Sequence, residues 1–273
     1  MPIDALFPVA GEHAIQNAAF VLEWPVQAPL SKANLEAAKA FHTELRNTFP
    51  VVQEHKAVTI NINADTPNVP SVPTFDDLGA VHFLKPDPAL GPAGVSRTIQ
   101  VNKHNLVVVI ADYSRWDIVW AEVSSWLDML LPIILDGRPI SALNLQYNDR
   151  LNWRGDPRAL VLSDVIRPDS KYVAPNIFEA NNLWHSHHGF IEERATPLPH
   201  RLTDNINLNL VLENHQLGLQ LFTSHRGELN NAVWDVTTAR DVVHTLMMDF
   251  HDRNKLVLKG LFTEAVCNKI NLT

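Results

Sequence analysis

The sequence predicts an α+β protein in two parts: residues 1–153 as a ferredoxin-like βαββαβ domain, and residues 154–273 as an antiparallel sheet backed by one long C-terminal helix. Three observations predict this fold class. Apolar segments with strand periodicity and helix periodicity alternate through the first half. Strictly alternating apolar and polar residues follow in the second half, and the chain closes with an apolar stripe at helical spacing.

The first half begins with a strand, a helix and a second strand. The apolar run Phe20–Trp24 predicts the first strand. Ser31 is a good N-cap for a helix whose apolar residues recur at helical spacing until Pro50 ends it. Alternating apolar residues over positions 58–62 predict the second strand.

Residues 63–95 interrupt this order, because they contain six prolines. Proline lacks a backbone N–H and fixes φ, so it is poorly suited to the interior of a sheet. We therefore expect a long loop or insertion here, with one short strand over Val81–Leu84.

Regular structure resumes after the insertion. Thr98–Val101 and Leu106–Ile110 predict a hairpin. Ser114 and Asp117 have the spacing of a capping box at the start of a second helix. Alternation over Ile140–Trp153 then predicts the last strand of the first domain.

The second half is expected to hold three antiparallel strands and one helix. Residues 182–193 predict one strand, and Ile206–Leu212 and Leu217–Leu221 predict a hairpin around the turn 213–216. The long helix begins at Thr238 or Asp241. Its apolar stripe consists of Val243, Met247, Phe250, Val257, Leu261 and Phe262.

Composition narrows the function. The formal charge of −8, from 22 basic and 30 acidic residues, argues against nucleic-acid binding, which needs Lys and Arg against phosphates. Cys267 is the one cysteine, so no intrachain disulfide can form. Met1–Ala10 lacks the features of a signal peptide, and no apolar run reaches the ~18 residues of a membrane span. We expect a cytoplasmic protein that does not bind membranes.

Five collinear segments resemble those of a known family. They are Ala19–Leu22 with Thr48–Pro50, Thr98–Val101 with Leu106, the Tyr-x-x-Trp helix start Tyr113–Trp116, the strand Leu145–Arg150 and the closing helix from His251 through Leu261–Glu264. Together they resemble a sporadically distributed bacterial family of about this length with no assigned function. In its Leu-Arg-Tyr-Ile-Asn-Arg strand, Ile-Asn stands where this chain has Asn148 and Asp149. The resemblance implies a two-part α+β fold and a link to defence or mobile-element loci, but no activity.

One pair of residues is a candidate metal site. His185 and His187 lie two apart on the strand expected over 182–193, so both side chains point to one face about 7 Å apart. Two imidazoles could bind Zn²⁺ or another divalent ion if a third ligand joins them. A solvent-facing polar strand edge explains the same residues without metal.

Six residues are candidates for an interaction surface: Trp116, Trp120, Tyr147, Arg150, His225 and Arg226. The two tryptophans share a helix face, which is typical of a core and would mark an interface only if that face were exposed. Arg150 could pair with a carboxylate between the two halves or hold an anionic ligand. His225 and Arg226 could serve acid–base chemistry at a sheet end or simply flank a turn at Gly227.

These patterns favour a non-catalytic protein-interaction or regulatory subunit, of a bacterial defence or mobile-element system, without catalytic residues or a cofactor. Its partner would be another protein or a second copy in a homodimer. The alternative is a metal-dependent hydrolase or nuclease that uses the His185–His187 pair. An RNA-processing role, as in CRISPR endonucleases with tandem ferredoxin-like halves, lacks the expected Gly-rich loop and basic residues.

Overall fold

The structure, a computed structural model, describes residues 2–59, 74–180 and 183–272. Its strands are β1 (Leu6–Pro8), β2 (Ile15–Glu23), β3 (Val51–Thr59), β4 (Thr74–Pro86), β5 (Val95–Asn102), β6 (Asn105–Ile110), β7 (Ile140–Trp153), β8 (Trp184–Arg194), β9 (His200–Glu213) and β10 (Gln216–Val233). Its α-helices are α1 (Lys32–Ala40), α2 (His42–Leu45), α3 (Trp116–Ile134), α4 (Leu162–Val165), α5 (Val236–Leu261) and α6 (Glu264–Lys269). Short 3₁₀ turns cover Pro2–Ala5, Pro88–Leu90, Pro157–Ala159 and Pro175–Glu179.

All of these strands join one antiparallel sheet, in the order β3-β4-β5-β6-β2-β7-β10-β9-β8. β1 and β2 pair with the same side of β7, one after the other along its length, and in β1 Leu6 pairs with Trp153. The sheet runs without a break across the expected domain boundary, because β7 pairs with β10 from Trp153↔Leu217 onward. The protein is therefore mixed α and β, dominated by one large antiparallel sheet with a long C-terminal helix. The division at residue 153 stays a prediction.

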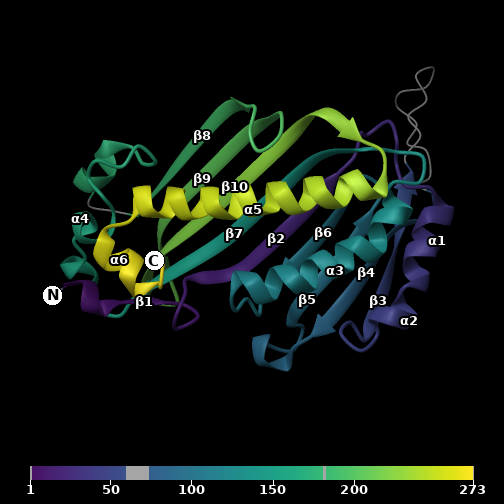
Figure 1. Ribbon diagram of the computed structural model, residues 1–273. Helices are drawn as coiled ribbons and strands as arrows, with labels where there is room; N and C mark the ends of the chain where they lie inside the picture. The colour runs from purple at the N-terminus through teal and green to yellow at the C-terminus, as the bar shows by residue number, and fades with distance from the viewer. Residues whose placement is uncertain (1, 60–73, 181–182, 273) are drawn as a thin grey trace, which may run out of the picture.

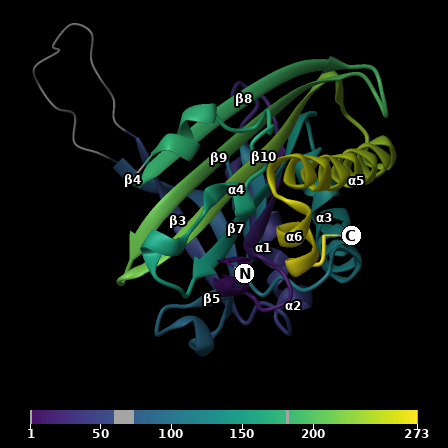
Figure 2. The ribbon, with the colours of Figure 1, turned by 90° about the vertical axis from the view of Figure 1, so that its left-hand side faces the viewer.

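The helices α1, α3 and α5 lie on one side of this sheet, and Figure 2 shows the other side open (Figures 1 and 2). α3 packs against both α1 and α5. Burial follows the two-residue period of a strand: in β9, for example, the residues that face α5 are buried and those between them are partly exposed. One face of the sheet thus holds the core, and the other meets solvent.

The proline-rich segment differs from the prediction. Residues 63–73 of it, and residues 60–62 of the strand predicted before it, lie outside the described residues. Thr74–Pro86 forms the strand β4, which pairs with β3 on one side and β5 on the other. The short strand predicted over Val81–Leu84 is confirmed as part of β4. The loop predicted around it is wrong over the rest of β4, because Pro86 falls at the end of the strand, at a register shift. The ferredoxin-like order is not confirmed, since β4 adds a strand between β3 and the β5–β6 hairpin.

Local sequence signals explain several boundaries. Ser31 caps α1, and a capping box joins it to Asn34. The turn between β9 and β10 places Asn214 and His215 at φ 49° and 63°, as a two-residue hairpin turn requires. The capping box predicted at Ser114 is wrong: Arg115 is the N-cap of α3 and makes no side-chain cap bond.

The core consists of two hydrophobic clusters, and α5 spans both. The N-terminal half of α5 packs Val243, Met247 and Phe250 into the cluster under α3, whereas Val257 and Leu261 belong to the cluster beneath α6. Polar residues from β7, β9, β10 and α5 lie between the clusters. We call these residues the polar belt: Asp149, Asp204, Thr223, His225, His251 and Asn254, all buried.

Among the described residues, no helix is both long enough and apolar enough to cross a bilayer.

A substitution at Gly227 of β10 tests how closely α5 packs on this strand. A Cβ at this position would lie 2.8 Å from Cζ of the buried Phe250 and 3.1 Å from Cδ2 of His200. Gly227→Ala should therefore lower the free energy of unfolding by about 1–3 kcal/mol in urea denaturation. In the matched control Gly189→Ala, the nearest neighbour is Asn205 Oδ1 at 3.5 Å, so stability should change by less than about 0.5 kcal/mol. Equal losses in both variants would contradict this packing.

Candidate functional site

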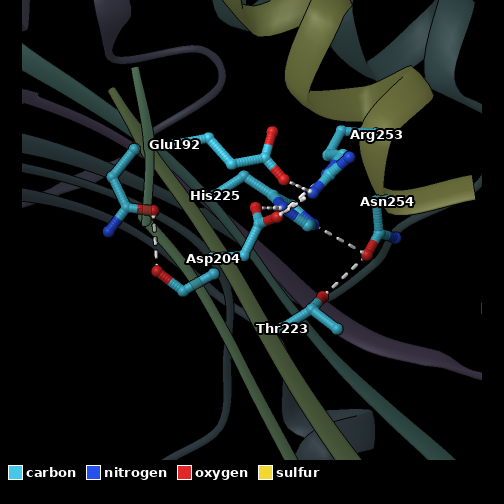
Figure 3. Close-up of polar contacts among 8 residues, drawn as sticks. Glu192, Asp204, Thr223, His225, Arg253 and Asn254 are labelled. Atoms are coloured by element: carbon cyan, nitrogen blue, oxygen red, sulfur yellow. Dashed lines mark hydrogen bonds and ion pairs between the residues drawn. The ribbon is translucent and has the colours of Figure 1, made fainter. Parts of the chain in front are cut away.

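The strongest polar constellation is the part of the polar belt that joins β9, β10 and α5 (Figure 3). Asp204 and His225 lie directly opposite each other on neighbouring strands, and His225 Nδ1 is 2.7 Å from Asp204 Oδ1. Arg253 donates from Nε and Nη2 to Asp204 Oδ2 at 2.8 and 2.7 Å. Asn254 Oδ1 accepts a hydrogen bond from Thr223 Oγ1 at 2.8 Å and lies 3.2 Å from His225 Nε2.

Asp204 is held as a carboxylate in the interior. Burial alone would raise its pKa, but the hydrogen bonds and charges of His225 and Arg253 outweigh burial and lower it. His225, Asp204 and Thr223 have no measurable exposure, so a substrate cannot reach them. Asp204, His225 and Thr223 have the residue types of a catalytic triad, and their hydrogen bonds join β9 and β10 to α5.

A second buried group lies on the same face of β7. The Tyr147 hydroxyl oxygen lies 2.9 Å from His251 Nδ1, within hydrogen-bond distance. The indole of Trp116 stacks on His251 with ring centroids 4.0 Å apart and an interplanar angle of 3°. Trp120 stacks on Trp116 in turn, at 5.6 Å. Asp149 lies two residues beyond Tyr147 on β7, and none of the described side chains hydrogen-bonds its buried Oδ2.

Burial shifts both titratable groups of this second cluster toward their neutral forms. It raises the pKa of Asp149 to about 7 and lowers that of His251 to about 4. The pKa values of Tyr113 and Tyr147 are raised by burial as well. A carboxyl group with this pKa can act in acid–base chemistry, but Asp149 is 4% exposed and Tyr147 is 1% exposed. Both groups therefore lie beneath the surface.

The open face of the sheet carries a shallow polar hollow. It has a volume of about 360 Å³, and five of its eight lining residues carry side-chain amides: Gln16, Asn17, Asn148, Asn209 and Gln220. Asp149, Leu221 and Phe222 complete the lining, so the buried Asp149 lies directly beneath this hollow. A larger cavity of about 550 Å³ at the end of β9 and β10 is lined mainly by apolar residues, among them Leu160, Leu210 and Leu217. Neither hollow brings together a nucleophile and a base.

The six candidate interaction residues do not gather on one surface. Trp120 and Tyr147 are buried and Trp116 is partly buried in the helix-side core, while His225 belongs to the polar belt. Arg150 and Arg226 lie on the open face, where Glu213 pairs with the first, and Glu23 and Glu228 pair with the second. Arg226 Nη2 is 2.7 Å from Glu23 Oε2, so this guanidinium bridges β10 and β2.

The candidate metal pair lies on the outermost strand. His185 and His187 are exposed on β8, opposite Asn209 and Asn207 of β9. Within residues 2–59, 74–180 and 183–272, no three His, Cys, Asp or Glu side chains gather closely enough to hold a metal ion. Metal binding by these two histidines stays a prediction.

The sequence did carry a signal for the polar belt that the initial interpretation missed. Asp204 falls in phase with the buried Leu202 and Ile206, and Thr223 continues the alternation of Leu219 and Leu221. Asn254 occupies the apolar stripe of α5 in the same way. A polar residue in an apolar phase on three neighbouring elements indicates a buried hydrogen-bonded layer.

The contribution of the Asp204–Arg253 ion pair to stability can be tested by removing each of the two carboxylates that bind Arg253. Asp204→Ala removes a partner from the buried His225 and from Arg253, whose side chain is 16% exposed, so the free energy of unfolding should fall by about 3 kcal/mol in urea, the lower end for breaking a buried ion pair. Glu192 also accepts from Arg253 Nη2, at 2.9 Å, but its side chain is 43% exposed. Glu192→Ala should therefore cost less than about 1 kcal/mol. Similar losses in the two variants would mean that Asp204 is not buried as described.

Asp149 predicts a pH-dependent difference in stability. An unfolded aspartate ionises near pH 3.8 and Asp149 in the fold near pH 7, so the unfolded state releases its proton first. This group's contribution to stability falls as pH rises from about 4 to 7 and is then constant. At pH 8 the free energy of unfolding of Asp149→Asn should exceed that of the parent by about 4 kcal/mol, and at pH 4 the two should be equal.

Asp241→Asn, at an exposed position on α5, is the control and should show no such trend. His251 has the opposite pH dependence below pH 6.5, so the difference between variant and parent is the quantity to measure. A difference that does not change between pH 4 and 8 would contradict the burial of a neutral Asp149.

Comparisons of the chain with protein-family models, with curated proteins and with solved structures found no match. The family resemblance of the sequence therefore stays a prediction, and a proposal about function has to rest on the geometry of the molecule itself.

Proposed function

We propose that this protein is a non-catalytic interaction protein that binds an extended polypeptide strand along β8. The observation that carries the proposal is the outer edge of β8. This strand is eleven residues long, pairs only with β9 among the described strands, and keeps an unbroken register from Trp184↔Leu210 to Arg194↔His200. In Figure 1 it borders the sheet on the side away from β10.

An edge strand exposes a row of backbone N–H and C=O groups that can pair with another chain, and proteins usually protect such edges with charges, prolines or bulges. The opposite edge of this sheet is protected. β3 has register shifts at His55/Lys56 and Ala57/Thr59, and it presents Glu54 and Lys56. The two edges of one sheet therefore differ in the features that prevent strand addition.

β8 lacks these protective features along most of its length. Residues 184–191 include no Lys, Arg, Asp, Glu or Pro. Ile191, on the open face of the strand, is 60% exposed, and Leu183, just before the strand, is 54% exposed. A strand that adds here would gain main-chain hydrogen bonds and cover both apolar side chains, which is how peptides augment the sheets of many binding domains.

The interior of the protein supports a binding role rather than a catalytic one. Its titratable clusters, around Asp204 and around Asp149, lie beneath packed side chains and serve hydrogen bonds within the fold. A regulatory role in a bacterial defence or mobile-element system remains part of the proposal, and the family resemblance alone supports it. A metal-dependent hydrolase based on His185 and His187 gains no support from the surrounding side chains.

Replacing Ile191 tests this proposal, because a lysine in the middle of an edge opposes strand addition. Affinity purification with quantitative mass spectrometry should recover a stoichiometric partner, either another protein or a differently tagged second copy. Ile191→Lys should reduce that recovery at least about tenfold, the effect of ~1.4 kcal/mol.

Val51→Lys makes the same kind of change on β3, where Val51 is 36% exposed, and recovery should be unchanged. Two results would count against the proposal: recovery of no partner at all, or equal recovery with both lysine variants.

A further inference from the structure

We infer that the strand which β8 accepts is β8 of a second copy of this chain, paired antiparallel about Gly189. This inference rests on the proposed function and names its partner. The two copies would be related by a twofold axis perpendicular to the sheet, so both helix layers would lie on the same side of one continuous sheet.

The sequence of β8 is self-complementary in this register. Gly189 stands at its middle, with five strand residues on each side. When Gly189 faces its own copy, all eleven residues find partners. Trp184 meets Arg194, His185 meets Glu193, Ser186 meets Glu192, His187 meets Ile191, and His188 meets Phe190, each pair occurring twice.

These pairs are chemically favourable. Trp184 with Arg194 joins an aromatic ring to a guanidinium, and His185 with Glu193 joins a nitrogen donor to a carboxylate. His188 already stacks on Phe190 of its own strand, with ring centroids 6.5 Å apart, so the inferred pairing would bring four rings together at the centre. No acidic residue faces another acidic residue, and no basic residue faces another basic one.

Gly189 has no reason within its own chain to be glycine. Its φ is not among the positive values of the described residues, and a Cβ would meet Asn205 Oδ1 at the ordinary distance of 3.5 Å. Glycine in the interior of a strand weakens it and often marks a close approach of another backbone. At the inferred axis the two copies of Gly189 would face each other with Cα atoms about 4.5–5.5 Å apart, a spacing that also accommodates alanine.

Charge at position 189 gives the decisive experiment, since a symmetric pair would bring the two new charges together. Sedimentation velocity over a concentration series should show the unaltered protein and Gly189→Ala as dimers. Gly189→Lys and Gly189→Glu should each dissociate, with a dimer dissociation constant raised at least about tenfold. An equimolar mixture of the two charged variants should recover the dimer, because Lys then faces Glu.

A cysteine scan provides a second readout that does not depend on charge. Gly189→Cys should form an interchain disulfide under mild oxidation, since the opposed Cα atoms fall within the ~4.4–6.8 Å that a disulfide allows. His185→Cys is the control: its own counterpart would be eight residues away along the strand, roughly 26 Å, and should not cross-link. The native Cys267 is buried in both variants.

Three results would overturn the inference: a monomer at every concentration, a dimer that tolerates both charges, or cross-linking of His185→Cys as fast as Gly189→Cys. Suppose that the protein is a monomer but binds another protein, and that Ile191→Lys abolishes this binding. Only the self-pairing would then be refuted. If Ile191→Lys recovers as much partner as the unaltered protein, strand addition itself would be refuted.

Discussion

The buried ion pair between Asp204 and Arg253, with His225 bonded to the same carboxylate, is the interaction on which the rest of the structure depends. It lies between two hydrophobic clusters that only α5, of the described helices, spans along its length. A slip of β9 by one residue would move Asp204 to the open face and leave His225 and Arg253 without its carboxylate. The polar belt therefore favours the observed register of β9 on β10. Arg253 also contacts Glu192 of β8, on the outer side of β9.

This constraint links the interior to the proposed surface. The helices supply a core on one face of the sheet only, and the polar belt aligns β9, β10 and α5, so that β8 ends the sheet in regular register with β9. The unbroken antiparallel register of β8 on β9 leaves its outer backbone groups in the regular alternating pattern that a further antiparallel strand needs. At the other end, the pairing of β3 with β4 has two register shifts. The asymmetry between the edges is thus a property of the whole sheet, and a proposal about one strand depends on all of its neighbours.

The sequence was most informative where periodicity and capping act locally. It predicted the β9–β10 hairpin, the β5–β6 hairpin, the α1 N-cap and the strand Ile140–Trp153. It predicted the part of β4 over Val81–Leu84 but not the rest of that strand, because prolines at a strand end look the same in sequence as prolines in a loop. The joining of both halves through β7 and β10 is a long-range pairing that no local pattern encodes.

For the candidate site, the sequence indicated His185 and His187, which lie on β8, but as metal ligands and not as part of a strand that accepts another. It could not show that this strand lies at an edge, since strand order appears only in three dimensions.

Hydrogen exchange of the β8 backbone amides, followed at increasing protein concentration, tests the central claim most directly. If β8 accepts a strand from a second copy, the amides of residues 184–194 that point away from β9 should become protected as concentration rises. Those of β3 should not change. Exchange from β8 that remains as fast as from an exposed loop at every concentration, with and without a captured partner, would contradict the account.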